Sequence, residues 1–416
     1  MIKKHLKKIL PLSVITAAIF IACAHKKKTS ITLFTWTPAD EYTVNQRIIQ
    51  KFQHANPQIK INHINDASGR AMDKLQTMLA GSSPPDVMSI HGAYFIPLAS
   101  KNTLLDLEPM TADADFNLQD FYPELIDGCR YQGKLYSLPR YTSVYVLFYN
   151  RGLFQEENLS YPGSNWTWSD YLLAAKKLTR DHDGDGVTDQ YGCIIDFWGA
   201  RIYPWIWQNN GQIFSADGLN CLLDQKEAVE AVQFLYDLQF RHRVTPKSLT
   251  HEFKNNVEFF HSGKAAMFIS GAWDIQNLRK NKNIDWDIAH LPRRKKSATI
   301  LGMENYAISK NSRYPYESWK LLRFLLSAET QKTMGRELEK QPSRRSAADD
   351  YIRHGSYNRR IMIEAMAYAV KPPNIAKWGE ISHYLQDELD LIWVKGKDPA
   401  FALRTAVSEI NKNLQP

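Results

Sequence analysis

The alternation of strand-like and helix-like segments between Ser30 and Ile90 constrains the fold of this chain more than any other feature. The strand-like segments are short, whereas the helix-like ones place apolar residues three and four positions apart. Asn56-Pro57 and Gly81 provide stop signals after the two helices. A β-α-β-α-β order of this kind predicts a mostly parallel sheet with helices on its faces. The predicted strands are 30–35, 59–64 and 86–90, and the predicted helices are 43–54 and 72–80.

Two segments of this opening are candidates for ligand contact. In parallel sheets, ligands gather beyond the carboxyl ends of the strands. Residues Trp36 to Glu41 follow the first predicted strand, and residues His91 to Tyr94 follow the third. We therefore expect both segments to be loops at one edge of the sheet.

The N-terminus has the layout of a bacterial secretory signal. Four lysines within the first eight residues precede an apolar run of 13 residues, Ile9 to Ile21. That run is well short of the ~20 residues that a membrane-spanning helix needs. Ala22 then precedes Cys23, which favours a lipoprotein signal, although Phe20 stands where leucine is commonest. An ordinary cleaved signal with an incidental cysteine is the alternative. We expect an exported protein, anchored through a lipid on Cys23 at the periplasmic or extracellular face of a membrane.

The composition bounds the class of protein. About 390 residues follow the signal, which is enough for two lobes with separate cores. The formal charge of +8 falls to +4 without the signal lysines, and that balance does not indicate nucleic-acid binding. Besides Cys23, the chain has only Cys129, Cys193 and Cys221, and no CxxC pair. We expect these three to be small buried packing residues, and one disulfide bond is the alternative.

Short motifs spread over almost the whole mature chain carry a family resemblance. In chain order they are FTW (34–36), FQHANP (52–57), PDV (85–87), GKLYSLP (133–139), LFYNR (147–151), WSDY (168–171), DGDG (183–186), QYG (190–192), GKAAM (263–267), GAW (271–273) and a helix at 318–326. Any one of them is weak, but together they resemble the bacterial extracellular solute-binding proteins of ABC importers. The similar members are of the sugar-binding type that includes maltose-binding protein.

The resemblance implies a two-lobed α/β fold of the periplasmic-binding-protein kind. Each lobe would be a mostly parallel sheet flanked by helices, and one ligand would lie in the cleft between the lobes. The implied crossings fall near 141–146, 287–290 and 341. The implied segments are a signal peptide at 1–22, a lipid-anchored linker at 23–29, lobe one at 30–140 plus 291–340, and lobe two at 141–290 plus 341–416. Closure around the ligand would be a hinge motion, and the closed form would face the permease subunits.

The residue types that a sugar cleft needs are supplied at several positions. Aromatic rings pack on the apolar face of a sugar, while carboxylates, amides, Arg and His bond its hydroxyl rim. The densest supply is the stretch 195–207, with five aromatic residues together with Asp196 and Arg201, where the family places ligand loops of the second lobe. The expected sugar-contact residues are Trp36, Glu41, His91, Tyr141, Trp198, Tyr203, Trp205, Trp273, Glu304, Arg344 and Trp378.

Each candidate has a structural alternative. Aromatic residues in a chain of this composition are often core residues, and Phe197 and Trp207 are the best examples here. His91 could be a structural histidine that only bonds its own neighbours. Arg344 competes with Arg345 for one role, so one of the two would be a surface residue.

An Asp-rich segment, Asp181 to Gly192, partly matches a calcium-binding loop. Asp181, Asp183, Asp185 and Asp189 occupy positions 1, 3, 5 and 9 of an EF-hand loop, a glycine holds position 6, and Val187 would offer its carbonyl. The twelfth position is a glycine where an EF-hand needs a glutamate, and the next residues are strand-like. A weaker structural calcium site and a plain turn both remain open.

The sequence favours a binding protein over an enzyme. It contains no GxSxG, HExxH or P-loop motif, and the pair Glu252 and Glu258 lacks a supporting pattern for glycoside hydrolysis. We expect a monomer that binds a sugar and delivers it to an ABC permease, with no nucleic-acid partner and no required cofactor. The alternatives are the same fold with glycerol phosphate, a polyamine or a metal chelate, and an exported carbohydrate-active enzyme. An adhesin or structural lipoprotein would not predict the α/β opening.

Overall fold

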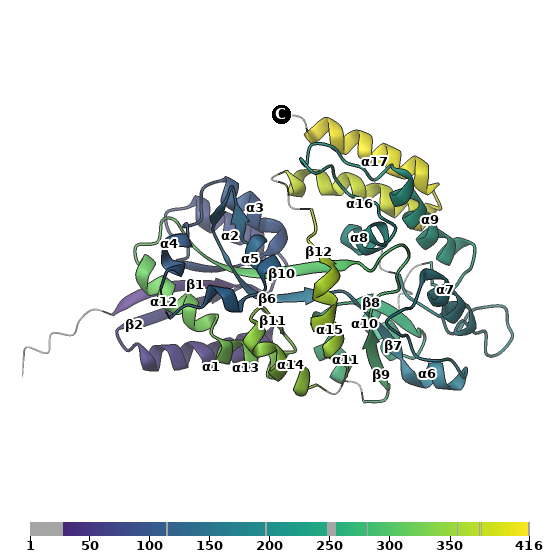
Figure 1. The fold of residues 1–416 in the computed structure, drawn as a ribbon, viewed down its shortest axis with the longest axis horizontal. Helices are drawn as coiled ribbons and strands as arrows, with labels where there is room; N and C mark the ends of the chain where they lie inside the picture. The colour runs from purple at the N-terminus through teal and green to yellow at the C-terminus, as the bar shows by residue number, and fades with distance from the viewer. Residues whose placement is uncertain are drawn as a thin grey trace, which may run out of the picture.

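The computed structural model describes residues 28–414, except 114, 196–197, 248–254, 281, 356, 374 and 376. The chain forms two α/β lobes joined by crossing strands (Figure 1). The predicted signal peptide and Cys23 lie outside the described residues. Within those residues, no helix is both long enough and apolar enough to cross a membrane.

Lobe one is built around a sheet in the order β11-β6-β10-β3-β1-β2, and β12 pairs with β10. Its strands are β1 (Thr29–Thr35), β2 (Ile59–Asn65), β3 (Val87–His91), β6 (Leu138–Val144), β10 (Thr299–Ile308), β11 (Gln341–Pro342) and β12 (Ala369–Val370), with a separate hairpin of β4 (Arg130–Tyr131) and β5 (Lys134–Leu135). Its helices are α1 (Ala39–Ala55), α2 (Ala71–Ala80), α3 (Gly92–Ser100), α4 (Glu108–Thr111), α5 (Pro123–Asp127), α12 (Pro315–Leu325) and α13 (Ala328–Leu338).

Lobe two is built around a smaller sheet in the order β8-β7-β9. Its strands are β7 (Val146–Asn150), β8 (Met267–Ser270) and β9 (Trp286–Ala289). Its helices are α6 (Arg151–Glu156), α7 (Trp168–Lys177), α8 (Gly199–Gln208), α9 (Lys226–Phe240), α10 (Asn256–His261), α11 (Ile275–Lys280), α16 (Trp378–Lys395) and α17 (Pro399–Leu414). Helix α14 (Ala348–Arg353) packs on α13 of lobe one, and α15 (Arg360–Glu364) lies between the lobes (Figure 1).

The strand directions differ from the mostly parallel sheets that were expected, although the two-lobed α/β class is confirmed. The pairs β1–β2 and β1–β3 are parallel, but β10 pairs antiparallel with both β3 and β6. In lobe two, β7 pairs antiparallel with β8 and β9. In lobe one the reason is that β6 carries the chain into lobe two and β10 carries it back, so these two strands run in opposite directions.

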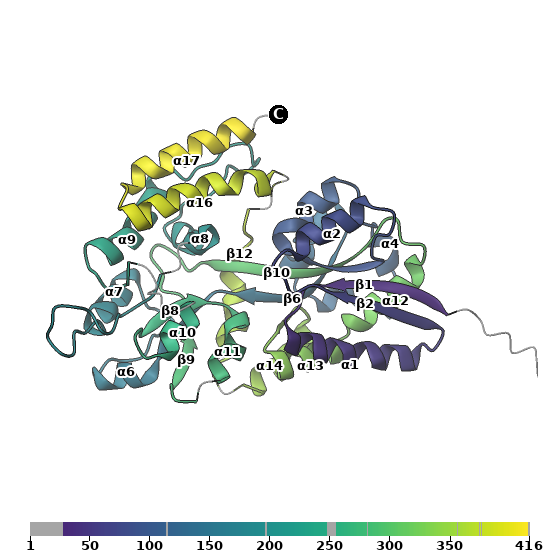
Figure 2. The same cartoon turned by 180° about the vertical axis from the view of Figure 1, so that it is seen from behind.

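The crossing is visible in the packing of β10. Ile300, near its start, belongs to the hydrophobic core of lobe two, together with Leu291 and Ala298. Tyr306 and Ile308, near its end, belong to the core of lobe one. A single strand thus spans both cores, and β6 lies beside it (Figures 1 and 2).

Helices cover both faces of the lobe-one sheet. Helices α1, α12 and α13 supply one apolar cluster, while α2 and α3 supply another on the opposite face. In Figures 1 and 2, α1 and α13 lie below the crossing strands, and α2 and α3 lie above them. This division into an upper and a lower side matters for the site.

The predicted opening of the chain is confirmed, with two differences at helix starts. Strands β1, β2 and β3 and helix α2 lie within one residue of the predicted bounds. Helix α1 begins at Ala39, so Glu41 lies in its first turn and not in a loop. Pro38 precedes the helix, and acidic residues in the first turn stabilise this early start. Helix α3 begins at Gly92 rather than after Tyr94, because the His91 side chain accepts a hydrogen bond from the Ala93 amide at 3.3 Å.

Candidate binding site

A groove of about 360 Å³ lies at the carboxyl ends of β1, β2 and β3. Because β2 and β3 both run parallel to β1, the residues that follow these strands meet at one edge of the sheet. Trp36 follows β1, Asp66 follows β2 and His91 ends β3, and all three line the groove. The first turns of α2 and α3 add Asp73 and Tyr94.

Aromatic rings form one side of the groove. The ring of His91 meets Trp36 and Tyr94 edge to face, with centroid separations of 5.9 and 6.4 Å. The indole N–H of Trp36 has no hydrogen-bond acceptor among the described residues. That N–H is itself buried, so the rings are what this side of the groove offers, and they match the apolar face of a sugar.

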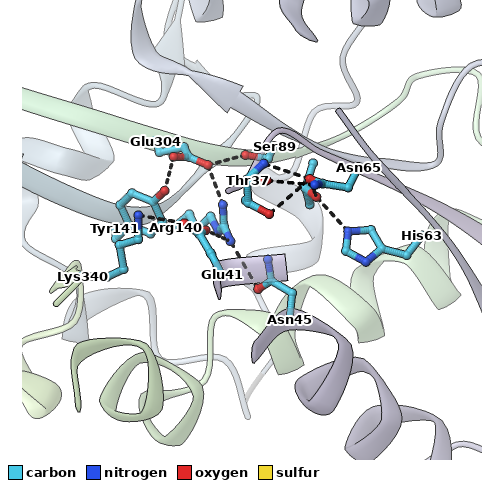
Figure 3. A network of polar contacts seen from close by, with 11 residues as sticks. Thr37, Glu41, Asn45, His63, Asn65, Ser89, Arg140, Tyr141, Glu304 and Lys340 are labelled. Atoms are coloured by element: carbon cyan, nitrogen blue, oxygen red, sulfur yellow. Dashed lines mark hydrogen bonds and ion pairs between the residues drawn. The ribbon is translucent and has the colours of Figure 1, made fainter. Parts of the chain in front are cut away.

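The loop that carries Trp36 is held by β2 (Figure 3). Asn65, the last residue of β2, accepts a hydrogen bond from the Thr37 amide and donates one to the Thr37 carbonyl, both at 2.8 Å. Its Oδ1 also accepts from the hydroxyl of Thr35 at 2.8 Å. The side chain of Asn65 therefore holds the Thr37 backbone and the Thr35 hydroxyl, on either side of Trp36.

Charged side chains form the other side of the groove. The hydroxyl and amide of Ser68 donate to Asp66 at 2.5 and 2.9 Å, and Lys74 lies 3.1 Å from the same carboxylate. These donors lower the pKa of Asp66 to about 2, so it is an anion at neutral pH. Arg70 and Asp73 line the groove beside it. Asp66, Arg70 and Asp73 are not among the predicted contacts, although the strand-end rule applied after the second strand would have found the first two. Tyr94 lies in the predicted segment His91 to Tyr94 but is not among the expected contact residues.

A second set of polar and aromatic residues lies on lobe two. The guanidinium of Arg201 lies over the rings of Tyr145 and Trp273, at 4.6 and 5.3 Å from their centroids. Trp273 is 42% exposed and Trp198 is 59% exposed. Trp198 precedes α8 and Arg201 is three residues later, so both are on one side of its first turn. Helices α3 and α8 both contact β10, so the two sets flank the same crossing strand from opposite lobes.

Trp273 owes its position to a glycine. A Cβ atom on Gly271 would lie 2.2 Å from the Trp273 ring and 2.7 Å from Oγ of Ser143 on β6. The hydroxyl of Ser143 also accepts a hydrogen bond from the Ala272 amide at 3.2 Å. The ring therefore folds over the backbone next to the crossing strands, where a larger residue at 271 would displace it.

Glu304 lies on β10 between these sets, and its carboxylate is engaged by internal donors (Figure 3). Oε1 accepts from the Ser89 hydroxyl at 2.5 Å and from Arg140 at 2.6 Å, and Oε2 accepts from the Tyr141 hydroxyl. Burial and the nearby Glu304 carboxylate raise the pKa of Tyr141 well above its usual value. The register of the sheet sets Glu304 opposite both His91 and Tyr141, so three predicted residues do come together.

Glu41 belongs to the same polar network, as a buried ion-pair partner. Arg140 donates to one of its oxygens at 2.6 Å, and the ammonium of Lys340 lies 2.8 Å from the other. Burial alone would raise the pKa of Glu41, but Arg140 and Lys340 outweigh it and hold the pKa below its ordinary value. The carboxylate thus helps to fix Arg140 rather than lining the groove.

Two of the predicted aromatic contacts lie in the core of lobe two. Trp205 is 4% exposed, and its ring packs against Trp168 and Phe234 at 5.4 and 5.6 Å. Tyr203 is buried beside Trp207. Nearly every side chain after the first turn of α8 is buried, which explains why one segment holds so many aromatic residues.

The last two predicted contacts do not line the groove. Arg344 is buried in lobe one, where it pairs with Asp120 at 3.1 Å and lies 4.1 Å from the ring centroid of Phe121. Arg345 instead donates to the Gln119 carbonyl. Trp378 begins α16, and its side chain is outside the described part of the structure.

The Asp-rich segment forms an exposed loop between α7 and the next part of lobe two. Carboxylate oxygens of Asp181, Asp183 and Asp189 lie within 4.8 Å of one another. Asp181 accepts from the amides of Gly184 and Gly186, both at 2.8 Å. The amide of Gly186 is the main reason that the pKa of Asp181 lies below its usual value. The loop is therefore held by its own backbone, and Asp185 turns to the Val187 amide instead.

Gly192, the twelfth position of that loop, cannot carry a glutamate. A Cβ atom there would lie 1.9 Å from the Ala175 carbonyl oxygen, because the segment packs closely on α7. The departure from an EF-hand is thus imposed by packing, and calcium binding stays a prediction.

Cys129, Cys193 and Cys221 are buried and free. Burial raises the pKa of the Cys129 and Cys193 thiols to about 12, so neither is a thiolate at neutral pH. Their expected role as small packing residues is confirmed by their burial.

Comparison with known proteins supports the two-lobed architecture. A galactooligosaccharide-binding protein from Bacillus subtilis is 25% identical over 361 residues, which is 84% of this chain and 81% of that protein. An ABC substrate-binding protein from Listeria monocytogenes, solved in complex with cycloalternan, has a TM-score of 0.85 at 26% identity and covers 93% of this chain and 99% of its own. The sugar-binding protein MalE from Xanthomonas citri has a TM-score of 0.81 at 20% identity, over 93% and 97% of the two chains, and shows the fold alone.

The family assignment rests on a longer match. Residues 36–332 match the family described as bacterial extracellular solute-binding protein, which is well over half of the chain. The match includes the groove residues of lobe one, both crossing strands and Trp273. The chain therefore belongs to the bacterial extracellular solute-binding protein family.

Proposed function

We propose that this protein is the extracytoplasmic substrate-binding component of an ABC importer, and that its ligand is a sugar or an oligosaccharide. The observation that carries this proposal is the pairing of two aromatic and polar surfaces across β10. Trp36 and Tyr94 belong to the lobe-one surface, and Trp198 and Trp273 to the lobe-two surface. Each surface combines rings with charged groups, which is the chemistry that a polyhydroxylated ring requires.

The ligands of similar proteins support this choice. The Bacillus relative is a galactooligosaccharide-binding protein, and the Listeria neighbour was solved with cycloalternan. We carry over the class of ligand, a neutral saccharide. The contacts that we propose are Trp36, Asp66, Arg70, His91 and Tyr94 on lobe one, and Tyr145, Trp198, Arg201 and Trp273 on lobe two.

The charge of the groove favours a neutral ligand over an anionic one. Asp66 is ionised at neutral pH and pairs with Lys74, and Asp73 and Arg70 line the groove beside it, so the nearby charges balance. A phosphate group would find no excess of positive charge here, which gives no support to glycerol phosphate. A polyamine would find these carboxylates already beside the cations Lys74 and Arg70, which disfavours further positive charge.

The carboxylates of Glu304 and Glu41 do not suit glycoside hydrolysis. Glu304 and Glu41 both form an ion pair with Arg140, and the pKa of Glu41 lies below its ordinary value, whereas a general acid needs a raised pKa. We therefore propose binding without turnover, and incubation of the protein with its saccharide ligand should return the ligand intact.

The place of action follows from the family, whose members are extracellular. We propose further that Cys23 is the lipidated first residue of the mature protein, that the protein acts as a monomer at the membrane surface, and that it hands its ligand to ABC permease subunits. Mass spectrometry of the membrane-extracted protein tests the anchor, since acylation adds a defined mass to the N-terminal peptide and Cys23→Ser abolishes it.

A thermal-shift screen of the purified protein tests the ligand class. The panel holds mono- and oligosaccharides, glycerol 3-phosphate and spermidine. A ligand at one hundred times its dissociation constant adds about 2.7 kcal/mol of stability, which is an easily measured rise in melting temperature. A saturable shift with a saccharide supports the proposal. Shifts confined to glycerol 3-phosphate or spermidine would keep the importer role and overturn the sugar.

A further inference from the structure

Glu339 joins the two lobes on the side away from the groove. It caps the C-terminus of α13 in lobe one, and its carboxylate is 1% exposed. Arg279, on α11 of lobe two, forms an ion pair with its Oε1. On the adjacent turn, the side-chain amide of Gln276 donates to the Glu337 carbonyl at 3.5 Å. Both contacts therefore span from lobe two to lobe one.

These contacts and the groove lie on opposite sides of the crossing strands. The groove is lined by residues of α2 and α3 and of the loops beside them, and these helices lie above β6 and β10 in Figures 1 and 2. Helices α11 and α13 lie below the same strands in both views. A rotation about β6 and β10 that closes the lobes over the groove must separate α11 from α13, because the strands act as the pivot.

We infer that Arg279 is an affinity-determining residue that never touches the ligand: its ion pair with Glu339 holds the lobes apart, and closure must break it. The inference rests on the proposed ligand-gated function only for its effect on affinity. The effect on lobe position exists without any ligand, because the pair biases the balance of open and closed forms directly.

The surroundings of Glu339 make the pair separable from stability. Its Oε2 is held by Arg359 and by the Tyr357 hydroxyl, the latter at 2.9 Å. Loss of Arg279 therefore leaves no unpaired buried charge. Arg279 itself is 46% exposed, so solvent screens the cationic end of the pair although the Glu339 carboxylate is buried.

The chain offers a matched control next to this contact. Arg47 on α1 forms an ion pair with Glu337 on α13, so the pair lies wholly within lobe one. Its arginine is similarly exposed and the pair lies on the same side of the sheet, although Glu337 is 39% exposed where Glu339 is buried. Arg47→Ala removes an Arg–Glu pair within lobe one and leaves in place the Glu337 carbonyl, which accepts from Gln276.

The first experiment needs no ligand. Probes on Lys101→Cys at the end of α3 and Asp387→Cys on α16, both exposed positions, report the distance between the upper sides of the lobes. The three buried cysteines give little background, and Cys23 is replaced by serine. Arg279→Ala should raise the population with the short distance by about two- to fivefold, the range expected for one ion pair with a solvent-screened arginine. Arg47→Ala should leave the distribution unchanged. An unchanged distribution in Arg279→Ala, or a shift to longer distances, overturns the inference.

The second experiment measures the dissociation constant for the saccharide that gives the largest thermal shift. Arg279→Ala should bind it about two- to fivefold more tightly, since affinity follows the fraction of the closing form. If the interlobe distance shortens in Arg279→Ala but no saccharide binds to the protein, the inference about the interlobe contact stands and the sugar assignment fails. If saccharides bind but neither affinity nor distance changes in Arg279→Ala, the sugar assignment stands and the inference fails.

Discussion

Arg140 on β6 donates from Nη1 to Oε1 of Glu304 on β10 at 2.6 Å, which ties together the two strands that cross between the lobes. Its other terminal nitrogen bonds Glu41 on α1 at 2.6 Å, and its guanidinium lies 5.0 Å from the ring centroid of Tyr306. The side chain is almost fully buried, so the whole arrangement is protected from solvent. The pivot of the two-lobed fold is therefore polar and charge-balanced inside an apolar core.

Replacement of Arg140 should be strongly destabilising. Arg140→Met leaves two buried carboxylates short of a partner, for which the expected loss is about 3–5 kcal/mol of unfolding free energy. Urea unfolding followed by circular dichroism measures it. Lys340→Met is the control, because Glu41 keeps Arg140 in that variant and the loss should be clearly smaller. Equal losses would show that the network does not depend on Arg140.

Asp66 predicts a specific pH dependence of stability. Its folded pKa of about 2 is below the unfolded value of about 3.9, so its stabilising contribution is present above pH ~4 and is lost as pH falls toward 2. The difference in unfolding free energy between the wild type and Asp66→Asn should therefore be constant from pH 7 to about 4 and shrink below that. A difference that changed between pH 5 and 7 would contradict the assigned pKa.

Trp205 and Trp273 should respond in opposite ways to truncation. Trp205→Ala removes a core ring and should lower the unfolding free energy by about 3–5 kcal/mol. Trp273→Ala removes a half-exposed ring and should change stability much less while weakening saccharide binding. Chemical unfolding and calorimetric titration of both variants separate the effects. If Trp205→Ala remained as stable as the wild type and lost only binding, Trp205 would be a ligand platform, as the sequence suggested.

The Asp-rich loop gives a prediction for calcium. Three exposed carboxylates without a twelfth-position ligand match the weak class of calcium sites, with dissociation constants of about 10⁻⁴–10⁻³ M. Calcium in this range should raise the melting temperature of the wild type but not of Asp181→Asn, and magnesium should not substitute. If the melting temperature does not change at calcium concentrations well above this range, the segment is only a turn.

Much of the fold could be predicted because the responsible signals are local. The first three strands and α2 follow from short-range periodicity and from stop residues such as Gly81. The start of α3 could not be predicted in the same way. It depends on one hydrogen bond from the Ala93 amide to His91 and on the close approach of Gly92 to the Met303 carbonyl, 211 positions away in the chain. The antiparallel pairing of the strands in lobe two could not be predicted either. It depends on the lobe from which the chain enters β7.

The site was predictable in part for the same reason. Trp36 and His91 follow strands, and the strand-end rule finds them from sequence. Glu41 has the composition of a ligand contact, but its partner Arg140 is 99 positions away and turns it into a buried structural anion. Trp205 shows the converse difficulty, since a cluster of aromatic residues on a helix has the same appearance in a core as in a cleft.

The most direct test of the account is whether one saccharide is held by both lobes. Calorimetric titration would compare Trp36→Ala on lobe one, Trp273→Ala on lobe two and Tyr316→Ala, whose ring is 74% exposed on α12. We predict that each of the first two variants weakens the binding of the same saccharide by about tenfold or more, equivalent to ~1.4 kcal/mol, while Tyr316→Ala binds as the wild type does. Unchanged affinity in either tryptophan variant would contradict a ligand held between the lobes.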